Sequence, residues 1–256
     1  MTNERKMRVA FIGSGKVATE LALIFRFKGI DITGISSRNK NSGSKLASHL
    51  DCPFIEDPNE LDAELIIIAT NDASVRTLCA SLSEDKFIVY TAGAVDLADL
   101  TRAHSGVFYP LQTFTENRHL MVDEIPVLLE SNSEGMRNKM EKLCSITGLT
   151  FEYCSSPDRQ KYHLAAVFVN NFVNHLIHKA QEQLLQNGLN WELLKPLLEE
   201  TIAKIGDLSA FDAQTGPAKR NDQSTLNTHQ GLLKGEELNI YEVLSRSIQN
   251  THNKHD

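Results

Sequence analysis

A short glycine-rich turn near the N-terminus constrains the fold of this chain most strongly. The segment Gly13-Ser14-Gly15-Lys16-Val17-Ala18 follows an apolar run over 9–12 and opens an amphipathic stretch that continues to residue 28. Gly13 permits a tight turn, Gly15 presents no Cβ to a ligand near the backbone, and Ala18 is small enough for a helix to pack on a sheet. The turn predicts a strand–turn–helix unit that binds a dinucleotide pyrophosphate at the helix N-terminus, with a purely structural glycine turn as the alternative. The expected contacts are Gly13, Ser14, Gly15, Lys16 and Val17.

The end of the second predicted strand, over 30–36, indicates which dinucleotide is bound. Ser36-Ser37-Arg38 stands about 20 residues after the glycines, where NAD enzymes place an acidic residue on the ribose 2′-hydroxyl. Two hydroxyls and a guanidinium can donate to a phosphate dianion, which a carboxylate would repel. We therefore predict NADP(H) as the cofactor, with Ser36, Ser37 and Arg38 at its 2′-phosphate. A surface arginine in a polar loop is the alternative interpretation.

Strands and helices alternate along the first part of the chain. An uninterrupted apolar run at 65–69 is typical of a parallel strand buried on both faces. The order predicts a doubly wound parallel sheet with helices on both faces, an N-terminal Rossmann domain over residues 1–154. The predicted strands are 8–12, 30–36, 53–55, 65–69, 87–90, 106–109, 126–129 and 150–153, and the helices are 16–28, 42–50, 73–82 and 133–147.

Two further turns belong to the same edge of the predicted sheet. Thr70 and Asn71 follow the strand at 65–69, and Ala92 follows the strand at 87–90. Ligands of such sheets lie beyond the carboxyl ends of the strands, so we expect these three residues at the ribose and nicotinamide. Asn71 or Asp72 is also a natural cap for the next helix, and the two roles are compatible.

The pattern changes after residue 154, where we predict an all-α C-terminal domain over 155–256. Helical stretches are expected at 158–186, 190–209, 222–233 and 237–251. The first of them carries a polar stripe on nearly one face of an apolar helix. A substrate cleft would give that stripe its partners, and contact with the cofactor or with another helix is the alternative. The stripe consists of His163, Asn170, Asn171, Asn174 and His178.

Three residues of the helical part are candidates for catalysis. His163 is the expected acid or base, and Asn171 the amide that orients the substrate. Arg220, in a polar turn over 215–222, can hold a substrate anion through two hydrogen bonds. A structural turn in which Arg220 pairs with an acidic residue is the alternative.

Composition and charge narrow the classes of function. The net charge of −7, without a cluster of lysine and arginine, argues against a nucleic-acid partner. Apolar runs fall far short of the roughly 18 residues that span a bilayer, and the first residues lack the pattern of a signal peptide, so we expect a cytoplasmic protein without membrane contact. The four cysteines show no ligand spacing, and no metal site is predicted.

The chain resembles a family of Rossmann-like NADP oxidoreductases whose C-terminal half is catalogued as a domain of unknown function. The resemblance covers nearly the whole chain and rests on the glycine turn and on the segments GVFYPLQTF (106–114), HLAAVFVNNF (163–172) and TGPAKRNDQSTLNTH (215–229). This family is similar to pyrroline-5-carboxylate reductase, to deazaflavin-dependent NADP reductases, and to 6-phosphogluconate and 3-hydroxyisobutyrate dehydrogenases. In these relatives the helical domain builds the substrate cleft and commonly the dimer interface, so the resemblance implies a homodimer formed through that domain.

Two departures from these relatives bear on mechanism. The hydroxyacid dehydrogenases carry a catalytic lysine four residues before an asparagine of the first long helix, where this chain has Ala166 or Val167. Tyr109 stands before Pro110, where many relatives have histidine, and is the alternative acid to His163. We expect an enzyme, an NADP(H)-dependent oxidoreductase that transfers hydride between the nicotinamide and a small carbonyl or imine. The alternatives are a non-catalytic dimeric NADP-binding sensor and a reductase whose second substrate is a deazaflavin.

Overall fold

The first part of the chain forms a single twisted sheet. The computed structural model describes residues 6–116 and 118–253. In these residues the sheet has seven strands in the order β2-β1-β3-β4-β5-β6-β7. Every neighbouring pair is parallel except β5 and β6, which run antiparallel. The strands are β1 (Arg8–Ile12), β2 (Asp31–Ser36), β3 (Leu65–Ile68), β4 (Ile88–Tyr90), β5 (Ser105–Pro110), β6 (Val127–Ser131) and β7 (Phe151–Tyr153).

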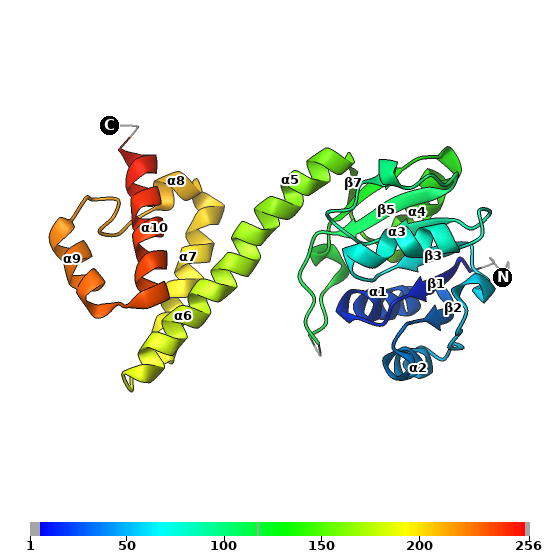
Figure 1. Ribbon diagram of the computed structural model, residues 1–256, viewed down its shortest axis with the longest axis horizontal. Helices are drawn as coiled ribbons and strands as arrows, with labels where there is room; N and C mark the ends of the chain where they lie inside the picture. The colour runs from blue at the N-terminus through cyan, green and yellow to red at the C-terminus, as the bar shows by residue number, and fades with distance from the viewer. Residues whose placement is uncertain (1–5, 117, 254–256) are drawn as a thin grey trace. The chain divides into compact units, whose positions relative to one another are not determined.

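Helices cover both faces of the sheet. Successive residues of each central strand point to opposite sides, and since these residues are apolar, both faces must be buried. Val9 and Phe11 of β1 face one side, where α1 (Lys16–Phe27), α2 (Lys40–His49) and α4 (Glu134–Thr147) pack. Ala10 and Ile12 face the other side, which α3 (Asp72–Ser81) covers. The result is the three-layer arrangement of Figure 1, with helices on both sides of the strands. It confirms the predicted Rossmann-like sheet.

The rest of the described chain is helical. The long helical stretch that begins at residue 156 has three parts: α5 (Ser156–Ala166), the π-helical segment η4 (Val167–Phe172) and α6 (Val173–Gln186). The following elements are η5 (Trp191–Leu194), α7 (Lys195–Asp207), α8 (Ala210–Ala213), α9 (Gln223–Leu232) and α10 (Gly235–His252). Over 154–253 no strand is present, which confirms the predicted helical C-terminal part. Three further single turns, η1 (Pro58–Glu60), η2 (Leu97–Asp99) and η3 (Val122–Glu124), lie in loops of the first part.

Four details differ from the predicted elements. The expected strand at 53–55 is wrong: only Phe54 pairs, with Ile35 of β2, and this pair is an isolated bridge. The sheet is not wholly parallel, since β6 returns beside β5 after a connection without a helix of ordinary length. The first long helix contains a π-helical segment, and the short helix α8 was not predicted.

The chain divides into two compact units, residues 1–171 and 172–256, each containing some of the undescribed residues. Helix α5 and most of the π-helical segment thus belong to the first unit. The sheet itself ends at Tyr153, just before the domain boundary expected at 154/155. The expected boundary between 1–154 and 155–256 follows the change of secondary structure and stays a prediction.

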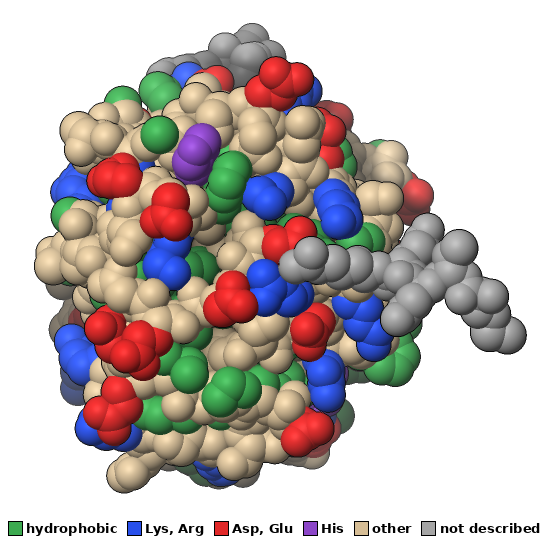
Figure 2. All heavy atoms as spheres, turned by 90° about the vertical axis from the view of Figure 1, so that its right-hand side faces the viewer, with side chains coloured by type: hydrophobic (Ala, Val, Ile, Leu, Met, Phe, Trp, Pro, Cys, Tyr) green, Lys and Arg blue, Asp and Glu red, His purple; other side chains and the backbone are tan. Residues whose placement is uncertain are grey.

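None of the described helices is long and apolar enough to cross a membrane. On the face drawn in Figure 2, lysine and arginine side chains are interspersed with aspartate and glutamate, and apolar side chains are scattered among them. Within the described residues, no group of three or more His, Cys, Asp or Glu side chains is placed to hold a metal ion. The four cysteines are free thiols, and Cys79 and Cys144 are buried.

Candidate functional site

A large pocket opens at the carboxyl edge of the sheet, within the first unit. The strand order changes direction between β1 and β3, and the loops after these two strands leave in opposite directions. The pocket there has a volume of about 1450 Å³. Its walls come from the glycine turn, the loops after β2, β3, β4 and β5, and the helical residues 162–171. A cavity of this size can hold a dinucleotide together with a small substrate.

The glycine turn has the geometry that a pyrophosphate seat requires. Gly13 has φ +125°, and a Cβ built on it would lie 2.2 Å from the carbonyl oxygen of Ala69. Its N–H donates to the carbonyl oxygen of Ser36 at 2.8 Å, which ties the turn to the end of β2. A Cβ at Gly15 would have no neighbouring atom within 4 Å, so the space in front of the helix is open. Gly15 also begins α1 without a side-chain cap, which leaves the first N–H groups of the helix free to bind an anion.

A cluster of three serine hydroxyls lies where the turn meets β2. The Ser14 hydroxyl hydrogen-bonds to that of Ser37 at 2.8 Å and to that of Ser42 at 2.7 Å. Arg38, beside this hydroxyl cluster, is exposed and lines the pocket, and no acidic side chain among the described residues forms an ion pair with it. Hydroxyl donors and an unpaired guanidinium are the groups that a phosphate monoester requires. The residues therefore fit the 2′-phosphate of NADP.

The loops after β3 and β4 continue the pocket wall. Thr70 and Asn71 line it, and Asn71 also caps α3 by accepting from the Ser74 N–H at 3.1 Å and hydroxyl at 2.6 Å. After β4 the lining residue is Thr91, whereas the predicted Ala92 is buried and does not line the pocket. Ser36 is also buried and contributes its carbonyl to the turn. The cofactor contacts expected for Ser36 and Ala92 stay predictions.

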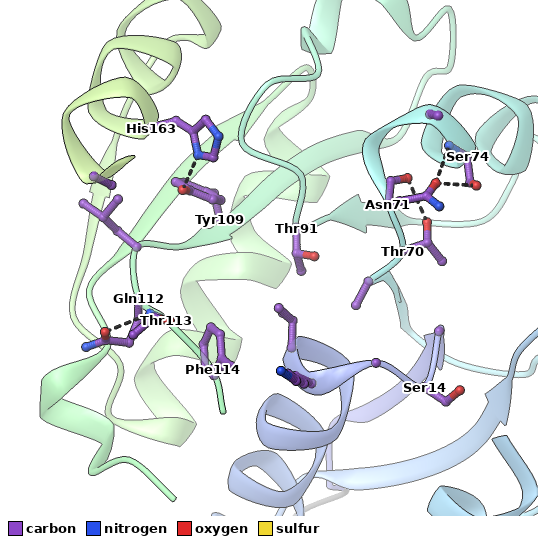
Figure 3. Close-up of a pocket in the computed structure, with 18 of the residues that line it drawn as sticks. Ser14, Thr70, Asn71, Ser74, Thr91, Tyr109, Gln112, Thr113, Phe114 and His163 are labelled. Carbon is purple, nitrogen blue, oxygen red and sulfur yellow. Dashed lines mark hydrogen bonds between the residues drawn. The ribbon is translucent and has the colours of Figure 1, made fainter. Parts of the chain in front are cut away.

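At the far end of the pocket Tyr109 and His163 form a hydrogen-bonded pair. The Tyr109 hydroxyl and the His163 Nδ1 are 2.9 Å apart, and the two rings meet edge to face at 6.0 Å. Figure 3 shows both side chains pointing toward each other, with Thr91 between them and the glycine turn. Tyr109 comes from β5 and His163 from α5. The two acids that the sequence offered as alternatives are therefore brought together.

The surroundings of Tyr109 favour the protonated phenol. Burial is the main cause that raises the pKa of Tyr109 above its ordinary value of 10, and the negative charge of Asp72 adds to it. The positive charge of Arg159 acts in the opposite direction and lowers this pKa. A tyrosine with a raised pKa keeps its proton at neutral pH and can donate it.

The polar stripe of the long helix is divided by the π-helical segment. His163, Asn170 and Asn171 line the pocket, and the Asn170 amide donates to the Asn171 side-chain oxygen at 3.4 Å. The wider π turn adds a residue to the helix and changes which side chains share a face beyond it, and such segments are frequent at functional sites. Asn174 and His178 belong to the second unit, where His178 lies 3.5 Å from Glu182.

Arg220 is exposed in the second unit, in the turn before α9. Its backbone N–H donates to the Gly216 carbonyl at 3.3 Å, and Asp222 caps α9 through the Thr225 N–H at 3.1 Å. The predicted turn is therefore present, and Asp222 caps the helix that follows it. The role of Arg220 as an anion anchor stays a prediction.

Several residues of the site escaped the sequence-based interpretation. Ser42 lies in the first turn of α2 and joins the site through its hydrogen bond to Ser14, although it does not itself line the pocket. Gly93 makes room for the tyrosine–histidine pair, because a Cβ there would lie 2.9 Å from His163 Nδ1 and 3.0 Å from Tyr109 Cε2. Arg159, one helical turn before His163, is fully buried. A lone arginine on a helix gives no sequence signal of burial.

The geometry defines a Rossmann-fold dinucleotide enzyme, and the comparisons with known proteins give its family. Residues 8–93 match the family described as NADP oxidoreductase coenzyme F420-dependent. Residues 125–248 match a domain of unknown function, DUF2520. A solved structure from Bacteroides fragilis, of a protein with a provisional assignment as an NADP oxidoreductase, is 31% identical, with a TM-score of 0.87 over 96% of this chain and 98% of that one. The chain belongs to this family of NADP oxidoreductases. No curated protein sequence matches it.

More distant structures share the fold. Pyrroline-5-carboxylate reductase from Streptococcus pyogenes is 17% identical, with a TM-score of 0.63 over 97% of this chain and 98% of that one. A reductive aminase from Aspergillus terreus, in complex with NADPH and ethyl-5-oxohexanoate, is 13% identical, with a TM-score of 0.73 over 98% of this chain and 97% of that one. These likenesses place the two-part architecture among known oxidoreductase folds. The family's cofactor is NADP(H), as the sequence predicted.

Proposed function

We propose that the protein reduces a small imine or carbonyl compound with NADPH. The observation that carries the proposal is the Tyr109–His163 pair in the same pocket as the glycine turn. One end of that pocket suits a pyrophosphate and a 2′-phosphate, and the other end holds a protonated phenol beside an imidazole. A reductive aminase and a pyrroline-5-carboxylate reductase, which share the fold, act on compounds of this kind, which supports the substrate class.

The proposed division of labour follows from the reaction. NADPH, when bound, supplies a hydride from C4 of its nicotinamide. Reduction of a C=N or C=O bond adds that hydride to carbon and a proton to nitrogen or oxygen, so the chain must deliver the proton. Tyr109 and His163 act as one proton-donating unit, in which the second residue restores the proton that the first gives up. The Asn171 amide, on the same wall, orients the polar atom of the substrate. An imine is more basic than a carbonyl and suits a site without the dehydrogenase lysine.

The experiment incubates the purified protein with NADPH and a panel of imines, ketones, aldehydes and 2-oxoacids. Consumption of NADPH with an imine or carbonyl, and formation of the reduced product, is the expected result. NADPH binding without consumption across the whole panel would contradict the proposal and favour a sensor. Consumption with a deazaflavin alone would also contradict it and assign the second substrate to that cofactor, as the name of the matched N-terminal family suggests.

Arg38→Ala is expected to weaken NADPH binding by roughly tenfold to hundredfold while NADH binding changes little, because one charge-assisted pair with a phosphate is worth about 1.5–3 kcal/mol. Titration calorimetry with both dinucleotides measures this. Lys40→Ala is the matched control: Lys40 is a nearby exposed cation that pairs with Glu56 at 2.7 Å and does not line the pocket. Equal losses for the two dinucleotides would exclude a phosphate role for Arg38.

We also propose that the protein is a homodimer formed through the helical unit. Within residues 172–253 the buried apolar side chains are only Ala213, Ala218 and Leu226. Large apolar side chains of this unit are exposed, which is costly for a separate chain in water. They include Leu176, Leu185, Leu193, Leu197, Ile202, Ile205, Leu232 and Val243.

The expected mass in solution is twice the 28.6 kDa of one chain. Leu197→Glu is expected to give monomers, because a charge on α7 would have to be desolvated in the interface. Phe27→Glu is the control, since Phe27 is an apolar side chain of the first unit that is 87% exposed. Light scattering coupled to gel filtration measures all three proteins. A wild-type protein with the mass of one chain would contradict the dimer.

A further inference from the structure

Arg159 has an environment that its place on a helix surface would not suggest. It lies in α5, one turn before His163, and its exposed fraction is 0%. Burying a guanidinium is costly unless every N–H group finds a partner. The partners of Arg159 come from two other segments of the chain, strand β6 and the loop after β4. The side chain therefore joins three parts of the first unit.

The contacts of Arg159 fix the loop after β4. Its Nε donates to the Gly93 carbonyl at 3.3 Å, and its Nη2 donates to the Val95 carbonyl. The Tyr90 hydroxyl donates to the same Val95 carbonyl at 3.2 Å. Both carbonyls belong to the loop that packs against the tyrosine–histidine pair. The side chains of Ala92 and Val95 anchor this loop in the core, and the Arg159 donors fix the carbonyls between and beside them.

Glu130 and Ser156 complete the arrangement. Arg159 forms an ion pair with Glu130 of β6, and its Nη2 donates to the Ser156 hydroxyl oxygen at 3.0 Å. That hydroxyl donates to Glu130 at 2.6 Å and accepts from the Leu97 N–H at 3.0 Å. The Ser156 N–H donates to the second Glu130 oxygen at 3.0 Å. The start of α5 is thus fastened to both the sheet and the loop.

Gly93 connects the hydrogen bonds of Arg159 to the Tyr109–His163 pair. A Cβ at this position would come within 3.0 Å or less of both Tyr109 Cε2 and His163 Nδ1, so the backbone of Gly93 packs directly against the pair. A shift of the loop by a fraction of an ångström would therefore move the two rings. Proton transfer depends on such distances, and a misplacement of about 1 Å can cost roughly a hundredfold in rate.

We infer that Arg159, held by Glu130 and Ser156, is a positioning residue that sets the Tyr109–His163 geometry through the Gly93 loop. The inference deepens the proposed function and rests on it for its catalytic consequence. Arg159 itself does not line the pocket. It acts through its contacts with the loop and through its place one turn before His163.

The test compares Arg159→Lys with Arg102→Lys. Lysine keeps the charge beside Glu130, but its single ammonium cannot replace the forked contacts to both carbonyls. Arg102 is a matched control: it is also buried, and it donates to the carbonyls of Cys79 at 2.8 Å and Leu82 at 2.6 Å. None of these three residues lines the pocket or hydrogen-bonds to the Tyr109–His163 pair. Nitrogen NMR of the imidazole rings reports the tautomer of His163, whose signals are assigned by their loss in His163→Asn.

The wild-type protein is expected to show a single His163 tautomer, because Nδ1 is engaged with Tyr109. In Arg159→Lys the His163 signals should move toward the values of an imidazole that exchanges between its two tautomers. The kcat of this variant should fall roughly tenfold to hundredfold, and its NADPH affinity should be almost unchanged. Arg102→Lys should keep the wild-type His163 signals and kcat. If Arg159→Lys does not fold, Ser156→Ala replaces it in the same measurements, because it retains the charges of Arg159 and Glu130 and removes only the hydroxyl between them.

Wild-type His163 signals in a folded Arg159→Lys protein would overturn the inference, whatever its activity. So would an equal change in Arg102→Lys, since it would report general loosening of the fold. A wild-type protein that reduces nothing in the substrate panel refutes the proposed function instead. The NMR comparison then still decides whether Arg159 fixes the pair.

Discussion

Gly13→Ala is expected to abolish measurable NADPH binding and to lower the free energy of unfolding by about 3 kcal/mol, from backbone strain and overpacking together. The φ of +125° is one that residues with a side chain rarely adopt. The new methyl group would also lie 2.2 Å from the Ala69 carbonyl oxygen at the start of the neighbouring loop. Relief of that clash requires movement of the loop that supports Thr70 and Asn71. Chemical denaturation and titration calorimetry measure the two effects.

Gly15→Ala is expected to weaken cofactor binding without a large effect on the stability of the fold. No atom lies within 4 Å of a Cβ at Gly15, and its φ of −80° is accessible to alanine. The free energy of unfolding should therefore fall by less than about 1 kcal/mol, the usual cost of an alanine at a helix N-cap. NADPH affinity should still fall by about tenfold or more, because the methyl group would occupy the place of the pyrophosphate. Undiminished affinity in Gly15→Ala would show that the dinucleotide binds elsewhere.

Tyr109→Phe is expected to lower kcat by about a hundredfold or more, the usual contribution of a positioned general acid. NADPH affinity should be nearly unchanged, since the pair lies at the other end of the pocket from the glycine turn (Figure 3). His163→Asn should cost a similar factor. In the proposed mechanism the two residues share one proton path, so the double variant should be no slower than the slower single variant. Tyr153→Phe, which removes a hydroxyl bound to Glu141 at 2.9 Å, is the control and should be fully active.

The same pair predicts the pH dependence of reduction. In the proposed mechanism the protonated phenol is the active form, and burial raises the pKa of Tyr109 above its ordinary value of 10. The rate should therefore show no loss from phenol ionisation at neutral or mildly alkaline pH, and should fall only as the pH rises through the raised pKa. Pre-steady-state reduction measured from neutral to strongly alkaline pH tests this. A multiplicative loss in the double variant, or an alkaline limb that survives in Tyr109→Phe, would exclude the shared path.

Local patterns predicted most of the fold. The apolar run of β3 and the amphipathic spacing of α1 are properties of short segments, because burial of one or both faces is written in consecutive residues. The antiparallel return of β6 was missed, since strand direction depends on the connection and not on the strand's own residues. The strand expected at 53–55 failed for a similar reason: its residues are suitable, but only Phe54 finds a partner in β2.

The candidate site divides in the same way. The cofactor end was predicted from the residues themselves, because a pyrophosphate binds backbone groups of one local turn, whereas Ser42 was missed. At the proposed catalytic end Tyr109 and His163 appeared only as alternatives, and neither Gly93 nor Arg159 was recognised. The π-helical segment also escaped prediction, because its wider turn leaves no periodic signature in six residues.

The sequence by itself determined the nucleotide-binding half, since a turn without side chains, the helix that follows and the polar end of β2 are all encoded within about thirty consecutive residues of one βαβ unit. Only the tertiary structure decided which side chains meet at the proposed catalytic end of the pocket. Tyr109 and His163 are 54 residues apart, and they meet because β5 and α5 are packed around the loop that Arg159 holds. Contacts of that range arise from the packing of whole elements, and no local pattern in the chain records them.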